Sequence, residues 1–128
     1  MKIDPIIAVQ DVEKSAAWYQ QLFGWKSMHG GREFEVLADQ DGEICLCLHQ
    51  WGTHDHPTME NPAFTPGNGL ILYVRTENME GIRARLKAMN YPVEREVQLN
   101  PNSHHREFSL IDPNGYYLTI SAFHRYGA

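Results

Sequence analysis

Two stretches of the chain are near-copies of each other, and this repeat restricts the fold more than any other feature of the sequence. The first runs from Arg32 to Gly42 and the second from Arg106 to Gly115. Each begins with Arg-Glu-Phe and ends with Asp-x-Asp/Asn-Gly, a typical hairpin turn signal. A duplicated strand–turn–strand unit builds a pseudo-symmetric cavity, so side chains at matching positions are expected to meet across it.

Hydrophobic periodicity extends the repeat to one strand, one helix and three strands in each half. In the first half Asp11 is the expected N-cap of the helix and Gly24 its end. In the second half Asn78 is the expected N-cap, and Pro92 follows the helix. The predicted strands are Ile3–Val9, Trp25–His29, Arg32–Ala38 and Ile44–Gln50, then Leu70–Val74, Val93–Leu99, Arg106–Ile111 and Tyr116–Phe123.

This pattern predicts an α+β fold of two tandem βαβββ modules. We expect one domain over residues 1–128, with module one at 1–50, a connection at 51–68 and module two at 69–128. Each helix covers one face of a small sheet and leaves the other face open. Two such mixed sheets side by side form a concave surface around a cavity, and strand alternation decides which residues line it.

Composition excludes several classes of protein. The net charge is −5 and no cluster of Lys and Arg stands out, so a nucleic-acid-binding surface is not expected. The apolar run from Pro5 to Val9 is too short for a signal peptide or a membrane span, and no membrane association is predicted.

Cys45 and Cys47 would share one face of one strand, which is poor geometry for a disulfide. Reduced thiols in a cytoplasmic protein fit best.

The chain resembles the vicinal oxygen chelate superfamily, which includes glyoxalase I, extradiol dioxygenases and bleomycin-resistance proteins. The residues that carry the resemblance are Val9–Ser15, Trp18-Tyr19, Leu22–Trp25 and Phe108–Gly115. The resemblance spans essentially the whole chain. It implies paired βαβββ modules, which agrees with the repeat, and a homodimer.

The resemblance also implies four positions for metal ligands, two in each module. They are Asp4, Leu46, Leu70 and Thr119 in this sequence, and Leu46 and Thr119 lie at the same distance after the turn glycines Gly42 and Gly115. Leucine offers no donor atom, and a threonine hydroxyl is a weak ligand. We therefore predict no metal and no cofactor.

The predicted cavity is an aromatic and aliphatic slot with a few polar points. A two-residue hairpin at Asp112–Gly115 would place Arg106, Phe108 and Leu110 on its walls. Strand parity adds Ile6, Ala8, Leu48 and Leu72 to the lining. The predicted ligand-binding residues are Asp4, Leu46, Gln50, Trp51, Leu70, Arg106, Phe108, Tyr117, Thr119 and Ser121.

Two further features, the histidines around the connection and Glu35, have side chains that could bind a metal or act in catalysis. His54 and His56 lie in the proline-rich connection, where solvated loop side chains are expected, and His49 has the parity opposite to Leu46. Glu35 faces the cavity if it pairs with Leu46 across the turn, where it could act as a general base. A β-bulge would instead turn Glu35 outward to solvent. The sequence leaves both alternatives open.

Three functions remain. The first is a metal-free small-molecule-binding protein, similar to bleomycin-resistance proteins, that sequesters an aromatic or cationic ligand; Asp4 or Glu35 would attract the cation. The second is a divergent glyoxalase- or dioxygenase-like lyase or isomerase, with Asp4 or Glu35 as base or with a relocated metal site. The third is a dimerisation module whose cavity is filled by its own side chains. We favour the first.

Overall fold

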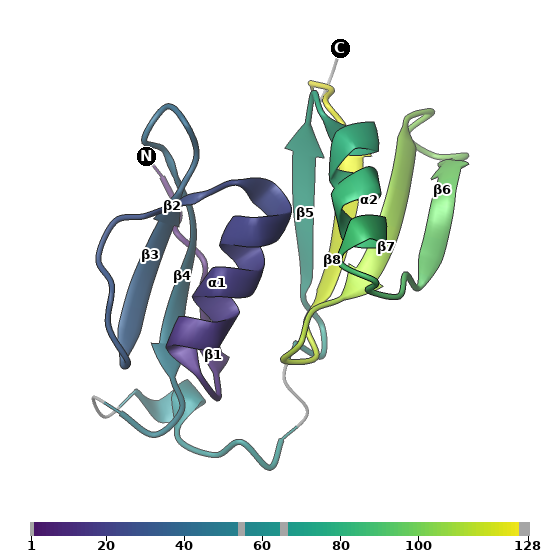
Figure 1. The fold of residues 1–128 in the computed structure, drawn as a ribbon. Helices are drawn as coiled ribbons and strands as arrows, with labels where there is room; N and C mark the ends of the chain where they lie inside the picture. The colour runs from purple at the N-terminus through teal and green to yellow at the C-terminus, as the bar shows by residue number, and fades with distance from the viewer. Residues whose placement is uncertain (1, 54–55, 65–66, 126–128) are drawn as a thin grey trace. The chain divides into compact units, whose positions relative to one another are not determined.

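Each half of the chain folds as one α-helix on a four-stranded mixed sheet, as the repeat predicts (Figure 1). The computed structural model describes residues 2–53, 56–64 and 67–125. The chain divides into two units, Met1–Pro66 and Gly67–Ala128, with the boundary inside the predicted connection. The α+β class and the two βαβββ modules are therefore confirmed. Within the described residues, no helix is both long enough and apolar enough to cross a membrane.

The first unit has the strand order β1-β4-β3-β2. Strand β1 runs parallel to β4, and the other neighbours are antiparallel. A short 3-10 helix, η1 (Pro57–Met59), lies in the connection, where the sequence predicts no helix. The elements are β1 (Ile6–Val9), α1 (Val12–Phe23), β2 (Lys26–Ser27), β3 (Phe34–Ala38) and β4 (Ile44–Gln50).

Helix α1 begins and ends where the sequence predicts. The Asp11 side chain accepts a hydrogen bond from the backbone N–H of Lys14 at 3.0 Å, which satisfies one of the unpaired donors at the helix start. Gly24 ends the helix with φ 74°, a left-handed conformation that glycine adopts without steric cost. The helix buries Val12, Ala16, Tyr19 and Leu22, and it contacts β3 and β4.

The second unit repeats this architecture with the strand order β5-β8-β7-β6. Its helix buries Met79, Ile82 and Leu86. Asn78 stands at the predicted N-cap, but its side chain makes no capping hydrogen bond. The elements are β5 (Ile71–Thr76), α2 (Met79–Ala88), β6 (Arg95–Leu99), β7 (Arg106–Ile111) and β8 (Tyr117–Ala122).

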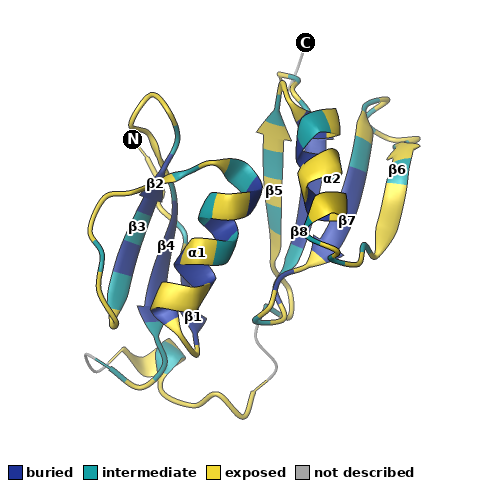
Figure 2. Ribbon diagram, viewed as in Figure 1, coloured by how far each residue is buried: buried dark blue, intermediate teal, exposed yellow. Residues whose placement is uncertain are grey.

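The two faces of the first sheet differ in what covers them. Glu35 and Leu48 are opposite each other, as are Leu37 and Leu46, and all four are buried. They share the face that packs under α1. Figure 2 shows buried segments of β3 and β4 beside this helix. The other, open face carries Ile6 with Cys47, Ala8 with His49, and Phe34 with His49. The prediction that Leu46 and Leu48 line a cavity is therefore wrong, and the prediction that His49 faces away from it is wrong as well.

The repeated turns have the same geometry, but in the first unit the bulge between Leu37 and Ala38 restores the register, so the turn changes the predicted faces only in the second unit. Both turns place three residues between the closing pair, because Asp39 N–H donates to Glu43 O and Asp112 N–H donates to Tyr116 O. The turn glycine has a positive φ in each copy. This geometry is longer by one residue than the two-residue hairpin assumed from the sequence, and a one-residue slip moves every side chain of a strand to the other face.

The second unit shows the consequence of that slip. Ile111 pairs with Tyr117, so Arg106, Phe108 and Leu110 lie on the face under α2. Two contacts with α2 locate that face directly. Arg106 Nη2 lies 3.2 Å from Glu80 Oε1, and the Arg83 guanidinium lies over the Phe108 ring at 5.9 Å. Leu72 pairs with Leu118 on the same face. The prediction that these residues line the cavity is wrong.

Candidate functional site

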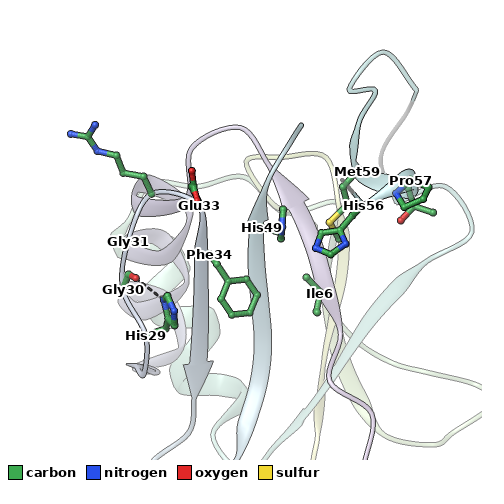
Figure 3. A pocket seen from close by; sticks show the side chains of 12 residues that line it. Ile6, His29, Gly30, Gly31, Glu33, Phe34, His49, His56, Pro57 and Met59 are labelled. Atoms are coloured by element: carbon green, nitrogen blue, oxygen red, sulfur yellow. Dashed lines mark hydrogen bonds between the residues drawn. The ribbon is translucent and has the colours of Figure 1, made fainter. Parts of the chain in front are cut away.

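A pocket with a volume of about 940 Å³ lies on the open face of the first sheet (Figure 3). Three strands contribute to it, with Ile6 on β1, Phe34 on β3 and His49 on β4. The turn from His29 to Gly31 forms one side, and η1 with His56 forms another. The hydrogen bond from Gly52 N–H to Met59 O, at 2.7 Å, ties η1 to the end of β4.

Aromatic rings follow one another along this pocket. His29 contacts Phe34 at 5.3 Å between ring centroids, Phe34 contacts His49 at 6.2 Å, and His49 contacts His56 at 4.8 Å. All three contacts are edge-to-face, with interplanar angles of 84°, 70° and 74°. Edge-to-face packing is a favoured geometry for aromatic pairs and holds the rings in defined orientations.

Two of the imidazoles have fixed tautomers. His29 Nδ1 is 2.7 Å from Gly30 O, and His49 Nδ1 is 2.7 Å from Gln50 O. A carbonyl oxygen only accepts hydrogen bonds, so the proton of each neutral ring resides on Nδ1.

Sequence reasoning missed this set of residues. His49 is only 3 % exposed and lies on the open face, whereas the sequence analysis assigned it no role. His56 is exposed, as expected for the connection, but it contacts His49. His54 lies outside the described residues. The signal for Phe34 was present in the sequence, because it is the last residue of the repeated Arg-Glu-Phe.

Glu35 is not a solvated edge residue. Its exposure is 4 %, and its carboxylate accepts hydrogen bonds from Ser27 Oγ and from the backbone N–H groups of His29, Gly30 and Val36, at 2.7, 3.1, 2.9 and 2.8 Å. Burial alone would raise the pKa of Glu35, but these hydrogen bonds outweigh it and lower the pKa. A bulge is present between Leu37 and Ala38, yet it does not turn Glu35 to solvent. A carboxylate that already accepts four hydrogen bonds is a poor general base, because these bonds stabilise its charged form.

Asp4, Gln50 and Trp51 do not belong to the described lining of this pocket. Asp4 is exposed and precedes β1. Burial, with the charge of Asp4 as a second cause, raises the pKa of the Cys47 thiol. Gln50 is half-buried at the end of β4, where it pairs with Val9. Trp51 is half-buried, and its backbone N–H donates to Val9 O at 3.2 Å.

Cys45 is the bulged residue of β4 and is half-buried. Burial raises the pKa of its thiol to about 11, and the charges of Asp39 and Glu43 act in the same direction. Both cysteines are free thiols.

The open face of the second sheet carries three of the predicted ligand-binding residues, Tyr117, Thr119 and Ser121. Tyr117, Thr119 and Leu70 line a pocket of about 650 Å³ together with Glu107 and Arg95. The Ser109 and Thr119 hydroxyls form a buried hydrogen bond at 2.9 Å. Ser121 is fully buried and donates to Ala122 O at 3.1 Å, so its hydroxyl is engaged within the sheet.

A histidine pair attaches the end of the described chain to β5. The His105 and His124 rings stack at 4.3 Å with an interplanar angle of 6°. His124 Nε2 is 3.1 Å from Tyr73 Oη, and the His124 carbonyl accepts a hydrogen bond from Arg75 at 2.6 Å. Burial, then the charges of His105 and Arg75, lower the pKa of His124 from its usual 6.5, while Glu107 acts in the opposite direction.

This lowered pKa predicts a pH-dependent attachment of residues 123–125. A detached His124 binds a proton more readily than an attached one, so the attachment is stable above about pH 6.5 and weakens as the pH falls below that value. We expect the NMR signals of Tyr73 to shift between about pH 7.5 and 5.5, with faster amide exchange in residues 123–125. The variant His124→Asn should lose this dependence. An unchanged Tyr73 signal across that range would contradict the prediction.

The comparisons with known proteins identify the family. The model of the Glyoxalase/Bleomycin resistance protein/Dioxygenase superfamily matches residues 2–120. The chain belongs to this superfamily. No protein of curated function shows a significant sequence match.

Solved structures of the superfamily share the fold at low sequence identity. A lactoylglutathione lyase from Agrobacterium tumefaciens is 15% identical with a TM-score of 0.74, over 100% of this chain and 97% of that one. The bleomycin resistance determinant encoded on the transposon Tn5 is 16% identical with a TM-score of 0.72, over 98% and 99%. A bleomycin-binding protein complexed with bleomycin is 17% identical with a TM-score of 0.69, over 97% and 99%.

The four positions where the resemblance implies metal ligands carry one carboxylate, two leucines and one hydroxyl, at Asp4, Leu46, Leu70 and Thr119. Leu46 lies under α1, Leu70 has no donor atom, and the Thr119 hydroxyl is bonded to Ser109. Among residues 2–53, 56–64 and 67–125, no three His, Cys, Asp or Glu side chains are grouped so that they could hold an ion. A divalent cation needs several converging donors, which these four positions do not supply.

Proposed function

We propose that the protein binds a small planar aromatic molecule in the pocket on the open face of its first sheet and holds it without transforming it. The observation that carries this proposal is the row of rings His29, Phe34, His49 and His56 along one pocket of about 940 Å³. Pockets of this size with apolar and aromatic walls and a few polar groups are typical of small-molecule sites.

The apolar part of the wall supports an aromatic ligand. Ile6 and Met59 join Phe34 in the lining, and methionine sulfur makes favourable contacts with aromatic rings. Phe34 is half-buried and contacts the imidazoles of His29 and His49, which hold its ring in place. The exposed part of the ring lines the pocket.

The same geometry supports binding more than catalysis. Glu35, one of the two carboxylates that the sequence offers as a possible base, lies on the opposite face and is held by four donors. The bleomycin resistance determinant and the bleomycin-binding protein share the fold, and their names refer to drug resistance and drug binding rather than to a reaction. Sequestration is therefore the function that the pocket supports best.

A binding experiment with a neutral aromatic compound, 2-naphthamide, tests the proposal. Titration followed by NMR should shift the backbone signals of Phe34 and His49 in a saturable manner. Phe34→Ala removes one aromatic contact and should weaken binding about tenfold, the equivalent of about 1.4 kcal/mol. Phe64→Ala is the matched control, because Phe64 is an exposed phenylalanine outside the described pocket lining. Equal affinity of the two variants would count against this pocket.

A further inference from the structure

We infer that the pocket on the open face of the second sheet binds an α-amino acid with an apolar side chain, through its ammonium and carboxylate groups together. This pocket has a volume of about 650 Å³, and all of its described lining belongs to the second unit. The proposed function does not involve it, so the inference is independent of the aromatic pocket in the first unit.

Two opposite charges line the pocket without neutralising each other. They are carried by Arg95 on β6 and Glu107 on β7, and neither has an ion pair within residues 2–53, 56–64 and 67–125. The Glu107 carboxylate accepts hydrogen bonds from two neutral groups, Asn100 Nδ2 at 2.7 Å and Tyr73 Oη at 3.4 Å. A ligand with a single charge would be repelled by one of the two side chains, whereas a zwitterion satisfies both.

The register of the sheet sets the two charges at diagonal positions. Arg95 is directly opposite Ser109, and Glu107 is two residues before Ser109 on β7. Diagonal neighbours on one face of an antiparallel pair are about 7–8 Å apart, within reach of long side chains. An α-amino acid carries its ammonium and carboxylate groups on one carbon atom, so it can lie between the two side chains and form hydrogen bonds with both.

The floor of the pocket holds one hydroxyl proton that no described residue accepts. Ser109 and Thr119 are 4% and 6% exposed, and their hydroxyls form a hydrogen bond with each other at 2.9 Å. One hydroxyl donates in this bond, so the proton of the other remains for a further partner. A buried polar group without a hydrogen bond costs free energy. Because Ser109 is adjacent to Arg95, this O–H group and the guanidinium can bind one carboxylate together.

The opposite end of the pocket is apolar. Tyr117 is two residues before Thr119 on β8 and pairs with Ile71 on β5. Ile71 and Leu70 are exposed, and their apolar surface is available to the side chain of a ligand. The charges therefore lie on β6 and β7 and the apolar surface lies toward β5. This arrangement matches an amino acid whose side chain is apolar.

Three compounds with the same side chain test the assignment: L-leucine, L-leucinamide, which lacks the carboxylate, and N-acetyl-L-leucine, which lacks the ammonium group. Titrations at about pH 6 keep α-amino groups charged. L-leucine should shift the backbone NMR signals of Ser109, Tyr117 and Thr119 in a saturable manner. Each derivative should bind about tenfold more weakly, because it loses the hydrogen bonds of one charged group.

Two variants assign each charge to its partner. Arg95→Gln should weaken the binding of L-leucine about tenfold and leave that of L-leucinamide unchanged. Glu107→Gln should weaken L-leucine equally and leave N-acetyl-L-leucine unchanged. Arg95 is exposed, and Glu107→Gln keeps an oxygen that accepts from Asn100, so both variants should fold. The matched controls Arg85→Gln and Glu77→Gln change the same charges at exposed positions outside the lining and should bind L-leucine normally.

Several results would overturn the inference. They are the absence of a saturable shift with L-leucine, equal affinity for L-leucine and both derivatives, or unchanged binding of L-leucine to Arg95→Gln and Glu107→Gln. A response of Phe34 and His49 in place of Ser109 and Thr119 would also contradict it, because the ligand would then lie in the first unit. The proposed function is judged by 2-naphthamide and Phe34→Ala, so each proposal can fail without the other.

Discussion

Replacing Glu35 by alanine is expected to reduce the free energy of unfolding of the first unit by about 3 kcal/mol. The substitution leaves the hydroxyl of Ser27 and the backbone N–H groups of His29, Gly30 and Val36 without their acceptor. Unpaired buried donors carry a desolvation penalty of about 1–3 kcal/mol each, partly relieved here by water. Urea denaturation followed through the NMR signals of β3 and β4 measures the loss.

Two variants control this experiment. Glu35→Gln keeps the shape and one acceptor oxygen, so about half of the loss is expected. Glu33→Ala removes an exposed carboxylate two residues earlier in the chain and should change stability by less than about 0.5 kcal/mol. If Glu33→Ala and Glu35→Ala reduced the free energy of unfolding equally, the four buried hydrogen bonds to Glu35 would not stabilise the first unit.

The same carboxylate gives the first unit a defined response to acid. The pKa of Glu35 is lower in the folded chain than its usual 4.5. Its stabilising contribution is therefore complete above 4.5 and is lost as the pH falls through the folded value. The stability of Glu35→Gln should vary less over that acidic range than the stability of the parent protein.

Replacing Phe108 by alanine is expected to destabilise the second unit by about 3–5 kcal/mol, the usual cost of truncating a buried phenylalanine. The ring is 0% exposed and packs under the Arg83 guanidinium of α2. The sequence analysis placed Phe108 on a ligand-binding wall, where truncation would instead weaken binding with little loss of stability. Thermal or urea denaturation therefore distinguishes the two locations.

Tyr117 provides the matched comparison, because the sequence analysis placed it on the same wall and the structure places it on the open face, half-buried. Tyr117→Ala should reduce stability by only about 1 kcal/mol. Phe108→Leu, which conserves most of the buried volume, should cost less than about 1.5 kcal/mol. Similar losses for Phe108→Ala and Tyr117→Ala would contradict the assignment of the two faces.

The order and type of the elements could be predicted from the sequence because they depend on local signals. Asp11 and Gly24 mark the ends of α1 through hydrogen bonding and backbone conformation that act within a few residues. The bounds of β4 and β7 follow from runs of apolar residues and agree with the structure.

The faces of the strands could not be predicted with the same accuracy, because they depend on the length of one turn. A two-residue hairpin at Asp112–Gly115 would place Phe108 on the cavity wall, but Gly115 adopts φ 96° and the turn closes between Asp112 and Tyr116. Phe108 and Arg106 therefore move from the cavity wall to the face under α2. Tyr117 and Thr119 were assigned to the open face and lie on it.

The pocket itself was harder to predict than the fold. Its aromatic row joins His29 and Phe34, which are near in sequence, to His49 and His56, which reach it from β4 and from the start of η1. Nothing local in the connection indicates that His56 contacts His49. Such a contact depends on how the connection returns to the sheet, and hydrophobic periodicity carries no information about that path.

The raised pKa values of Cys45 and Cys47 have a practical consequence for work with this protein. Only the thiolate reacts readily with alkylating reagents, and both side chains stay almost entirely protonated at neutral pH. Maleimide labelling should therefore modify a newly introduced surface thiol, for example in Phe64→Cys, in preference to the two native ones. Fluorescent or paramagnetic reporters can be attached within the connection without first removing the natural cysteines.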